Sequence, residues 1–232
     1  MAKLEINVDV KPRGIASAYV DAPFDKGKEA LESHGYNVIS LEQNARLRMQ
    51  EGKDFYVSRN GNWVREGVIC VPKKGKFLTK VSPIMTNPKE ATNCQRNGRN
   101  FYLTDEQVKQ ALENSVLLSA NSVPTNRFGE CDTTVYAFGN SAEDYGNFLR
   151  DTGIKEMPIW TTGLQEKPFV RQQWFDGLDS RSVFDSCRNL GYNSRVRGIN
   201  IDSEGTAPKN LETPKKESKS YLVSKPMSSI RL

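Results

Sequence analysis

Residues 169–199 read FVRQQWFDGLDSRSVFDSCRNLGYNSRVRGI, and this stretch decides how the chain is organised. Its first seven residues, Phe169 to Phe175, are rich in aromatic and β-branched types, as expected of a buried strand. A second strand is predicted from Arg195 to Ile201. Between the two, Asp, Gly, Ser, Arg and Asn follow one another with neither a helical nor a strand period. We therefore predict an irregular polar segment held between two fixed strands.

The irregular segment lacks five amino acids that are common elsewhere in the chain. No Lys, Glu, Gln, Met or Trp occurs from Asp176 to Arg195, although these types supply 50 of the 232 residues. A random window of this length would lack all five roughly once in a hundred times. Either a specific process at the DNA level restricts the amino acids of this segment, or the segment is a polar loop whose composition arose by chance.

The five missing types share a property of the genetic code. An asparagine codon is two adenines followed by a pyrimidine, and randomising the adenines reaches every amino acid except these five. The segment, its two flanking strands and the upstream Trp160-Thr161-Thr162 resemble the variable region of proteins diversified by diversity-generating retroelements. In those proteins, template adenines are mutated during reverse transcription. The pattern is most similar to the archaeal branch of that family.

This resemblance implies a fold. Such proteins have a C-type-lectin fold of the type also found in formylglycine-generating enzymes, so we expect an α+β fold with two helices and a short-stranded antiparallel sheet. The firm resemblance covers about residues 155–201, and residues 55–160 fit it more loosely. We expect an αβ N-terminal extension over residues 1–50 and a lectin-like domain over 51–202, with its variable region at 169–199. Residues 203–232 have the composition of a flexible tail.

The resemblance also implies a ligand-binding patch on the variable segment. We expect the following side chains to be exposed and to bind: Asp176, Gly177, Asp179, Ser180, Arg181, Val183, Phe184, Asp185, Ser186, Cys187, Asn189, Gly191, Tyr192, Asn193 and Ser194. Arg, Phe and Tyr often dominate binding energy, so Arg181, Phe184 and Tyr192 are the strongest candidates.

Other residues of this region are expected to be structural. We expect Leu178, Arg188 and Leu190 to face inward and hold the frame. Trp160 and Trp174 are large aromatic residues that we place in the core.

The sequence predicts no metal, cofactor or catalytic residue. A calcium site needs six to eight oxygens, and Glu166-Lys167-Pro168 and Trp174-Phe175-Asp176 depart from the lectin motifs that supply them. One histidine and no CxxC spacing give no basis for a zinc site. Formylglycine-generating enzymes use a cysteine pair with copper, whereas Cys187 alone lies in the matching part. We therefore expect non-catalytic binding of an unidentified protein or other macromolecule.

Two other function classes remain open from the sequence. One is an oxidoreductase similar to formylglycine-generating enzymes, which copper binding and oxidation of a substrate cysteine would favour. The other is a basic nucleic-acid adaptor, which salt-sensitive binding would favour. A net charge of +5 is mild, and no basic patch with interleaved aromatics is visible. Nucleic acid is therefore the weaker expectation.

The hydropathy pattern predicts no membrane span. No apolar run approaches the length that a spanning helix needs, and the mean hydropathy is −0.62. Residues 1–10 contain no apolar core of a signal peptide. We expect a cytoplasmic protein, with the cell or virion surface as the alternative if another export route exists.

Local signals predict several further elements. Ser40 with Gln43 and Thr104 with Gln107 form capping boxes, which open helices. Residues 55–83 are predicted to be β-structure, with Asn60-Gly61 as a hairpin turn. Residues 121–139 are rich in Gly, Asn and Pro and predict loops.

Overall fold

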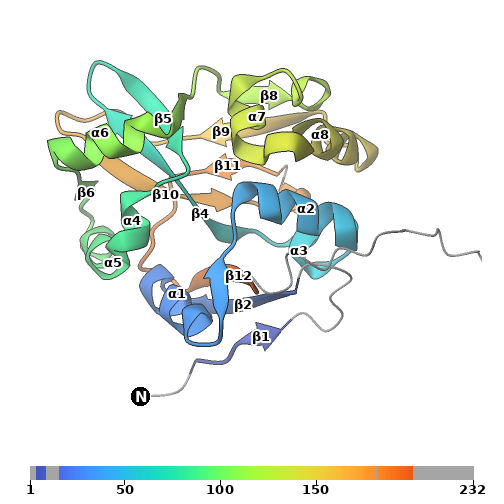
Figure 1. Ribbon diagram of the computed structural model, residues 1–232, viewed down its shortest axis with the longest axis horizontal. Coiled ribbons are helices and arrows are strands. Elements are labelled where there is room, and N and C mark those ends of the chain that lie inside the picture. Colours follow the sequence, from blue (N-terminus) through green and yellow to red (C-terminus); the bar gives the residue numbers. More distant parts are fainter. Residues whose placement is uncertain (1–3, 9–15, 181, 201–232) are drawn as a thin grey trace, which may run out of the picture.

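The computed structural model describes residues 4–8, 16–180 and 182–200, and it shows helices packed around one large sheet (Figure 1). The strands are β1 Asn7–Val8, β2 Ser17–Ala22, β3 Tyr36–Val38, β4 Asn62–Val71, β5 Gly75–Thr79, β6 Phe101–Tyr102, β7 Ser115–Leu117, β8 Ser122–Pro124, β9 Glu156–Trp160, β10 Phe169–Phe175, β11 Phe184–Asp185 and β12 Ser194–Asn200. The α-helices are α1 Phe24–Glu32, α2 Leu41–Glu51, α3 Tyr56–Arg59, α4 Pro83–Thr86, α5 Pro88–Arg96, α6 Asp105–Glu113, α7 Asp132–Phe138 and α8 Ala142–Asp151. The predicted tail, 203–232, lies outside the described residues.

The two strands that flank the variable segment are central to the sheet. Its order runs β1-β2-β12-β4-β10-β11-β9-β8. The long strand β4 runs antiparallel to β10, from Cys70 opposite Phe169 to Asn62 opposite Phe175. The predicted strand at 169–175 is thus confirmed, as is the strand that ends the variable segment.

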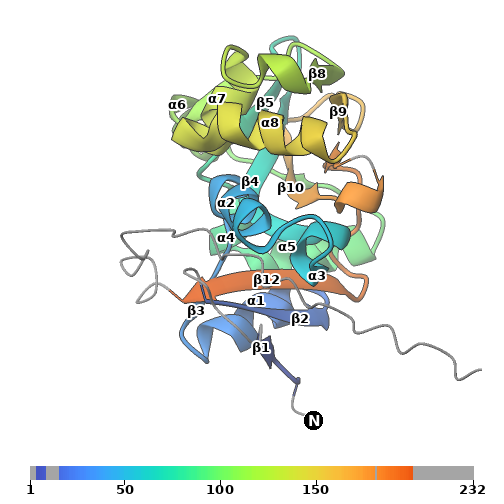
Figure 2. The ribbon, with the colours of Figure 1, turned by 90° about the vertical axis from the view of Figure 1, so that its right-hand side faces the viewer.

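Alternate side chains of the β4–β10 pair enter two cores on opposite faces. Val64 and Phe175 join a first core with α2, α7 and α8, whereas Trp63 and Trp174 join a second core with α1, α5 and α6. Figure 1 shows α5 and α6 to the left of β4 and α2, α7 and α8 to its right, and Figure 2 shows α7 and α8 at the top with α1 at the bottom. Side chains alternate across a strand, so both faces of the pair are apolar and covered.

The N-terminal residues contribute directly to this sheet. Strand β2 runs antiparallel to β12 along its length, from Ser194 opposite Ala22 to Ile199 opposite Ser17. Helix α1 packs on β12 through Gly27, where a Cβ would collide with the Val196 side chain. The domain boundary at residue 50 remains a prediction, but residues 17–22 belong to the same sheet as the variable region.

The helix starts that were predicted from capping boxes are confirmed, while other elements differ from expectation. Both boxes have the two reciprocal hydrogen bonds, at Ser40 and at Thr104. The described ranges hold eight α-helices, among them α5, which had no clear sequence signal, and α7, which lies in the stretch 121–139 that was predicted to be loops.

The predicted Asn60-Gly61 hairpin is wrong. These residues follow the helical turn α3 and lead into β4. An added Cβ at Gly61 would lie 2.6 Å from Trp174 Nε1, so this glycine is needed for a close approach to the core. No helix in the described part of the chain is long and apolar enough to cross a membrane.

Candidate functional site

The variable segment turns back on β10 immediately after that strand ends. The amide of Asp176 donates to the Val183 carbonyl at 3.0 Å, and the amide of Ser182 donates to the Gly177 carbonyl at 3.1 Å. Strand β11 then pairs antiparallel with β10 and parallel with β9. Part of the segment is therefore built into the sheet.

The expected exposure is wrong for six of the predicted site residues. These six are buried: Asp176, Gly177, Val183, Phe184, Asp185 and Ser186. Phe184 is 1% exposed, and its ring lies 5.6 Å from the Phe138 ring and 5.4 Å from the Phe175 ring, centroid to centroid. Strand β11 inserts between β10 and β9 and places Phe184 in the first core. The carboxylates of Asp176 and Asp185 are instead buried in ion pairs with Arg188.

Gly177 has a steric role. A Cβ at this position would collide with the backbone carbonyl of Arg59. The chain can make its turn after β10 at this distance from α3 only if residue 177 has no side chain.

Arg188 was expected to face inward, but it covers the surface of the second core. Its guanidinium carbon lies 4.4 Å from the centroid of the Trp174 ring. The same guanidinium forms ion pairs with the carboxylates of Asp176 and Asp185, both at 3.3 Å. Asp176 also accepts a 2.7 Å hydrogen bond from Trp174 Nε1. The side chain remains 43% exposed, so Arg188 is a surface residue fixed by two carboxylates.

The other predicted residues lie at or near the surface. Asp179, Cys187, Tyr192 and Asn193 are exposed, and Tyr192, at 69%, is the most exposed large hydrophobic residue among those the structure describes. Three more are half-buried: Asn189, Gly191 and Ser194. Arg181 and the side chain of Ser180 lie outside what the structure describes.

The two leucines predicted to hold the frame are packed as expected. Leu190 is buried in the second core, and Leu178 is half-buried against the first core.

Arg48 of α2 holds the start of the segment by its backbone. This arginine is fully buried, and its guanidinium donates to the carbonyl of Asp176 at 2.7 Å and to that of Phe175 at 3.4 Å. It also donates to Tyr145 Oη at 3.1 Å and lies 4.1 Å from the centroid of the Phe175 ring. A buried guanidinium is stable only with several acceptors, and here most of them belong to the turn.

Two other framework residues hold the far end of the segment. Gln95 of α5 accepts from the Leu190 amide at 3.1 Å through its side chain, and its carbonyl accepts from Asn189 Nδ2 at 2.8 Å. The amide of Phe24 donates to the Leu190 carbonyl at 3.0 Å. No local sequence signal marked Arg48 or Gln95, because both lie far from the segment in sequence.

The position of Trp160 differs from the prediction. It was placed in the core, yet it is 50% exposed at the end of β9. The carbonyl of Trp160 accepts from the Ser186 amide at 3.0 Å, so this aromatic residue lies beside the exposed Cys187. The surface around the variable segment therefore includes a large fixed side chain.

Cys187 was also expected to have no neighbouring cysteine. The structure places the buried Cys70 of β4 close enough for an electrostatic interaction between the two thiols. Burial raises the pKa of the Cys70 thiol, and burial together with Asp185 raises the pKa of the Cys187 thiol. Both shifts favour the neutral thiol over the thiolate, which is the nucleophilic form. In the described ranges, no three His, Cys, Asp or Glu residues are grouped as a metal site would need.

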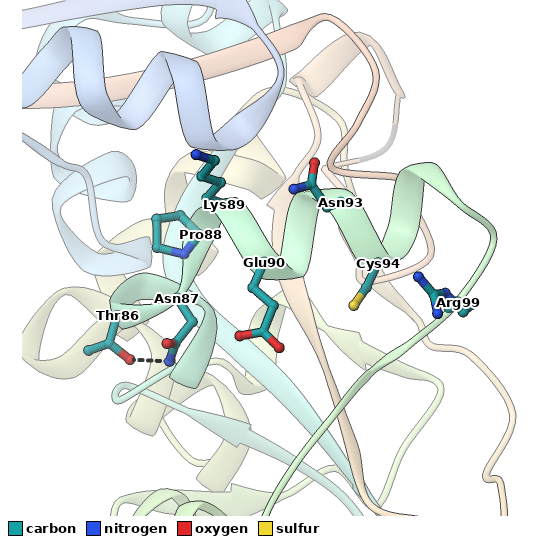
Figure 3. Close-up of a pocket in the computed structure, with 8 residues that line it drawn as sticks. All are labelled: Thr86, Asn87, Pro88, Lys89, Glu90, Asn93, Cys94 and Arg99. Atoms are coloured by element: carbon teal, nitrogen blue, oxygen red, sulfur yellow. Dashed lines mark hydrogen bonds between the residues drawn. The ribbon is translucent and has the colours of Figure 1, made fainter.

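A surface hollow lies at α5, lined by residues from Thr86 to Arg99. It has a volume of about 690 Å³. Figure 3 shows Glu90 and Cys94 pointing from one side of α5 into it, with Arg99 beyond the end of the helix. Its lining is a mixture of charged and polar side chains on an open surface, which does not select one chemistry.

Comparisons with known proteins agree with this architecture. No protein-family model and no curated protein matches the chain. A solved structure, described as "Accommodation of massive sequence variation in Nanoarchaeota by the C-type lectin fold", is similar with a TM-score of 0.60. The match has 14% identity and covers 82% of this chain and 100% of the other. Identity this low establishes a shared architecture and not a shared ligand. The chain has the C-type lectin fold, here a mixed α/β architecture.

Proposed function

We propose that this chain is a target-recognition protein, and that a retroelement diversifies its exposed positions between residues 176 and 194. In this proposal it binds a protein or other macromolecular partner without converting it chemically. The restricted alphabet of the segment supports the proposal. So does the similarity to a structure described in terms of massive sequence variation in this fold.

The observation that carries the proposal is the way in which the framework holds the segment. Arg48 binds the carbonyls at one end, and Gln95 and Phe24 bind the amide and carbonyl of Leu190 at the other. Every amino acid except proline supplies the same backbone groups. Exposed side chains between these anchors can therefore change without breaking the hydrogen bonds that position the segment.

Burial narrows the set of positions that we propose to vary. Asp179, Cys187, Tyr192 and Asn193 are exposed, and substitutions at exposed positions usually change the free energy of unfolding little. Phe184 is packed in the first core and Val183 is fully buried, so most substitutions at either position would be costly. We assign the recognition surface to the exposed group and a framework role to the buried one.

The neighbouring DNA tests the diversification. We expect a near-copy of the segment that encodes residues 168–199, located beside a reverse transcriptase gene. The copy should differ from the coding segment almost only where it carries adenine. Differences spread over all four bases would refute diversification by this mechanism.

A capture experiment tests recognition. The chain is used to capture partners from lysates of host or neighbouring cells, and Tyr192→Ala is compared with Tyr102→Ala. Both tyrosines are well exposed, but Tyr102 lies on β6, outside the variable segment. We expect Tyr192→Ala to weaken capture and Tyr102→Ala to leave it unchanged. Equal capture by all three proteins would place recognition elsewhere on the chain.

A further inference from the structure

The loop that follows β9 packs onto the ends of β4 and β5, next to the variable segment. Lys76 of β5 donates to Thr161 Oγ1 at 2.7 Å, and Cys70 Sγ lies 4.0 Å from Thr162 Oγ1. In the sheet, Cys70 pairs with Lys76 on one side and with Phe169 on the other. Residues 161 and 162 therefore lie directly over this part of the sheet.

Arg171 of β10 enters the same cluster. It lies two residues beyond Phe169 on the same strand, so its side chain points to the face that Cys70 occupies. Arg171 and Lys76 both interact electrostatically with Cys70 and with Cys187. The hydrogen bond from the Ser186 amide to Trp160 brings Cys187 to the same place. The cluster thus joins the fixed framework to an exposed position of the variable segment.

These two cations have no counter-charge among the described residues. Neither Lys76 nor Arg171 takes part in an ion pair there, and the buried Nε of Arg171 has no hydrogen-bond partner. Burial lowers the pKa of Arg171 because it disfavours the charged form. Asp185, the carboxylate that acts on Cys187, is paired with Arg188. Arg48 also has a buried Nε without a hydrogen-bond partner, but its other two nitrogens donate to hydroxyls and to the carbonyls of Phe175 and Asp176.

We propose that Lys76, Arg171 and the hydroxyls of Thr161 and Thr162 form an oxyanion subsite, which takes a carboxylate or phosphate group carried by the protein partner. A guanidinium presents parallel donors that match either group, and an ammonium adds a second positive charge. Partial burial strengthens the attraction relative to water. The half-exposed Trp160 beside the cluster offers an apolar contact for the chain that carries the anion. The identity of the carrier rests on the proposed function, whereas the anion chemistry does not.

The test uses the full chain with acetate and with inorganic phosphate as separate probes, at an ionic strength kept constant with sodium chloride. The first readout is the Nε–H resonance of Arg171, which reports an anion directly. The second is the rate at which iodoacetamide alkylates Cys187 at pH 8, followed by peptide mass spectrometry. An anion that neutralises the cluster should raise the thiol pKa and slow alkylation roughly tenfold, the effect of about one pKa unit on the thiolate fraction.

A charge-matched pair of variants isolates the subsite. Lys76→Gln/Arg171→Gln removes both cations of the cluster, and Lys73→Gln/Lys74→Gln removes two exposed cations from the adjacent turn. We expect the slowing of Cys187 alkylation to disappear in the first and to persist in the second. Equal effects in both variants would refute the subsite, because they would indicate non-specific screening.

If Lys76→Gln/Arg171→Gln fails to fold, the Arg171 Nε–H resonance of the wild-type chain tests the subsite by itself. A saturable shift of Arg171 Nε–H by either probe supports the subsite, and the absence of any saturable shift overturns it. Stronger binding of phosphate would identify a phosphorylated partner, whereas comparable or stronger binding of acetate would identify an acidic side chain. Since neither readout needs the partner or the DNA locus, failure of the proposed function would leave this result standing. If the chain captures a partner but shows no response to either anion, the subsite is refuted and the proposed function is not.

Discussion

Replacing Arg48 by Met tests the idea that the framework holds the variable segment by its backbone. Methionine keeps a long apolar side chain at this fully buried position but has no donors. The substitution therefore removes the 2.7 Å hydrogen bond to the Asp176 carbonyl and the longer bond to the Phe175 carbonyl. Both carbonyls belong to the point where the segment leaves β10.

The expected magnitude follows from opposing contributions. A hydrogen bond from a charged donor stabilises by about 1.5–3 kcal/mol, and a buried acceptor left without a donor costs about 1–3 kcal/mol. Removing a buried guanidinium also relieves several kcal/mol of desolvation. We expect a net destabilisation of about 2–4 kcal/mol, concentrated in the turn. This corresponds to roughly 30- to 1000-fold faster local opening, since about 1.4 kcal/mol is a factor of ten.

Amide hydrogen exchange measures this opening residue by residue. The amides of Asp176 and Ser182 close the turn through hydrogen bonds of 3.0 and 3.1 Å, and both should lose protection in Arg48→Met. The amide of Leu190, which Gln95 holds at the other end, should change much less. Arg46→Met is the matched control, because it removes the same charge from an exposed position on the same helix.

Two outcomes would refute the reasoning. Unchanged protection at Asp176 and Ser182 would mean that Arg48 does not hold the turn. Equal loss of protection in Arg46→Met would mean that the lost charge, and not the lost hydrogen bonds, loosens the segment.

Two further predictions concern stability. Phe184→Ala should lower the free energy of unfolding by about 3–5 kcal/mol, because Phe184 is buried, whereas Tyr192→Ala should lower it by less than about 0.5 kcal/mol. Equal melting temperatures of the two variants would refute the burial assignment. Burial raises the pKa of Glu66 to about 7 from 4.5, so this carboxyl holds its proton more strongly in the folded chain. The resulting stability is complete below about pH 4.5 and is lost as pH rises through 7, which amounts to roughly 3 kcal/mol. Melts of Glu66→Gln from pH 4 to 8 should lack this decline, and an unchanged decline would contradict it.

The elements that the sequence predicted well are those with local signals. The strand at 169–175 is a run of aromatic and β-branched residues that is buried on both faces, and the capping boxes place their donors and acceptors within four residues. The C-type lectin fold was predicted from the resemblance of the strands that flank the variable segment to those of a known family. The similarity to a solved structure of that fold confirms the prediction. Each of these signals lies within one short stretch of chain.

The burial of residues 183–186 could not be predicted in the same way. Strand β11 has two residues, and its existence depends on β9, which lies more than twenty residues earlier. Its sequence is polar around one aromatic residue, so nothing local separates it from an exposed loop. The prediction that Trp160 is buried was wrong for the opposite reason. Its size favours burial, but its position at the end of β9 leaves half of the residue exposed.

Burial also restricts what a diversifying mechanism could change here. Randomised adenines in a codon can deliver Asp or Arg at any position that they encode, and at Phe184 such a charge would enter a cluster of aromatic rings. An unpaired buried charge is among the most destabilising of substitutions. At Gly177, any side chain would meet the Arg59 carbonyl. If this segment is diversified, the adenines of its template must therefore lie mainly in the codons of exposed residues such as Tyr192 and Asn193. The buried half of the segment would then keep the fold constant while the exposed half changes.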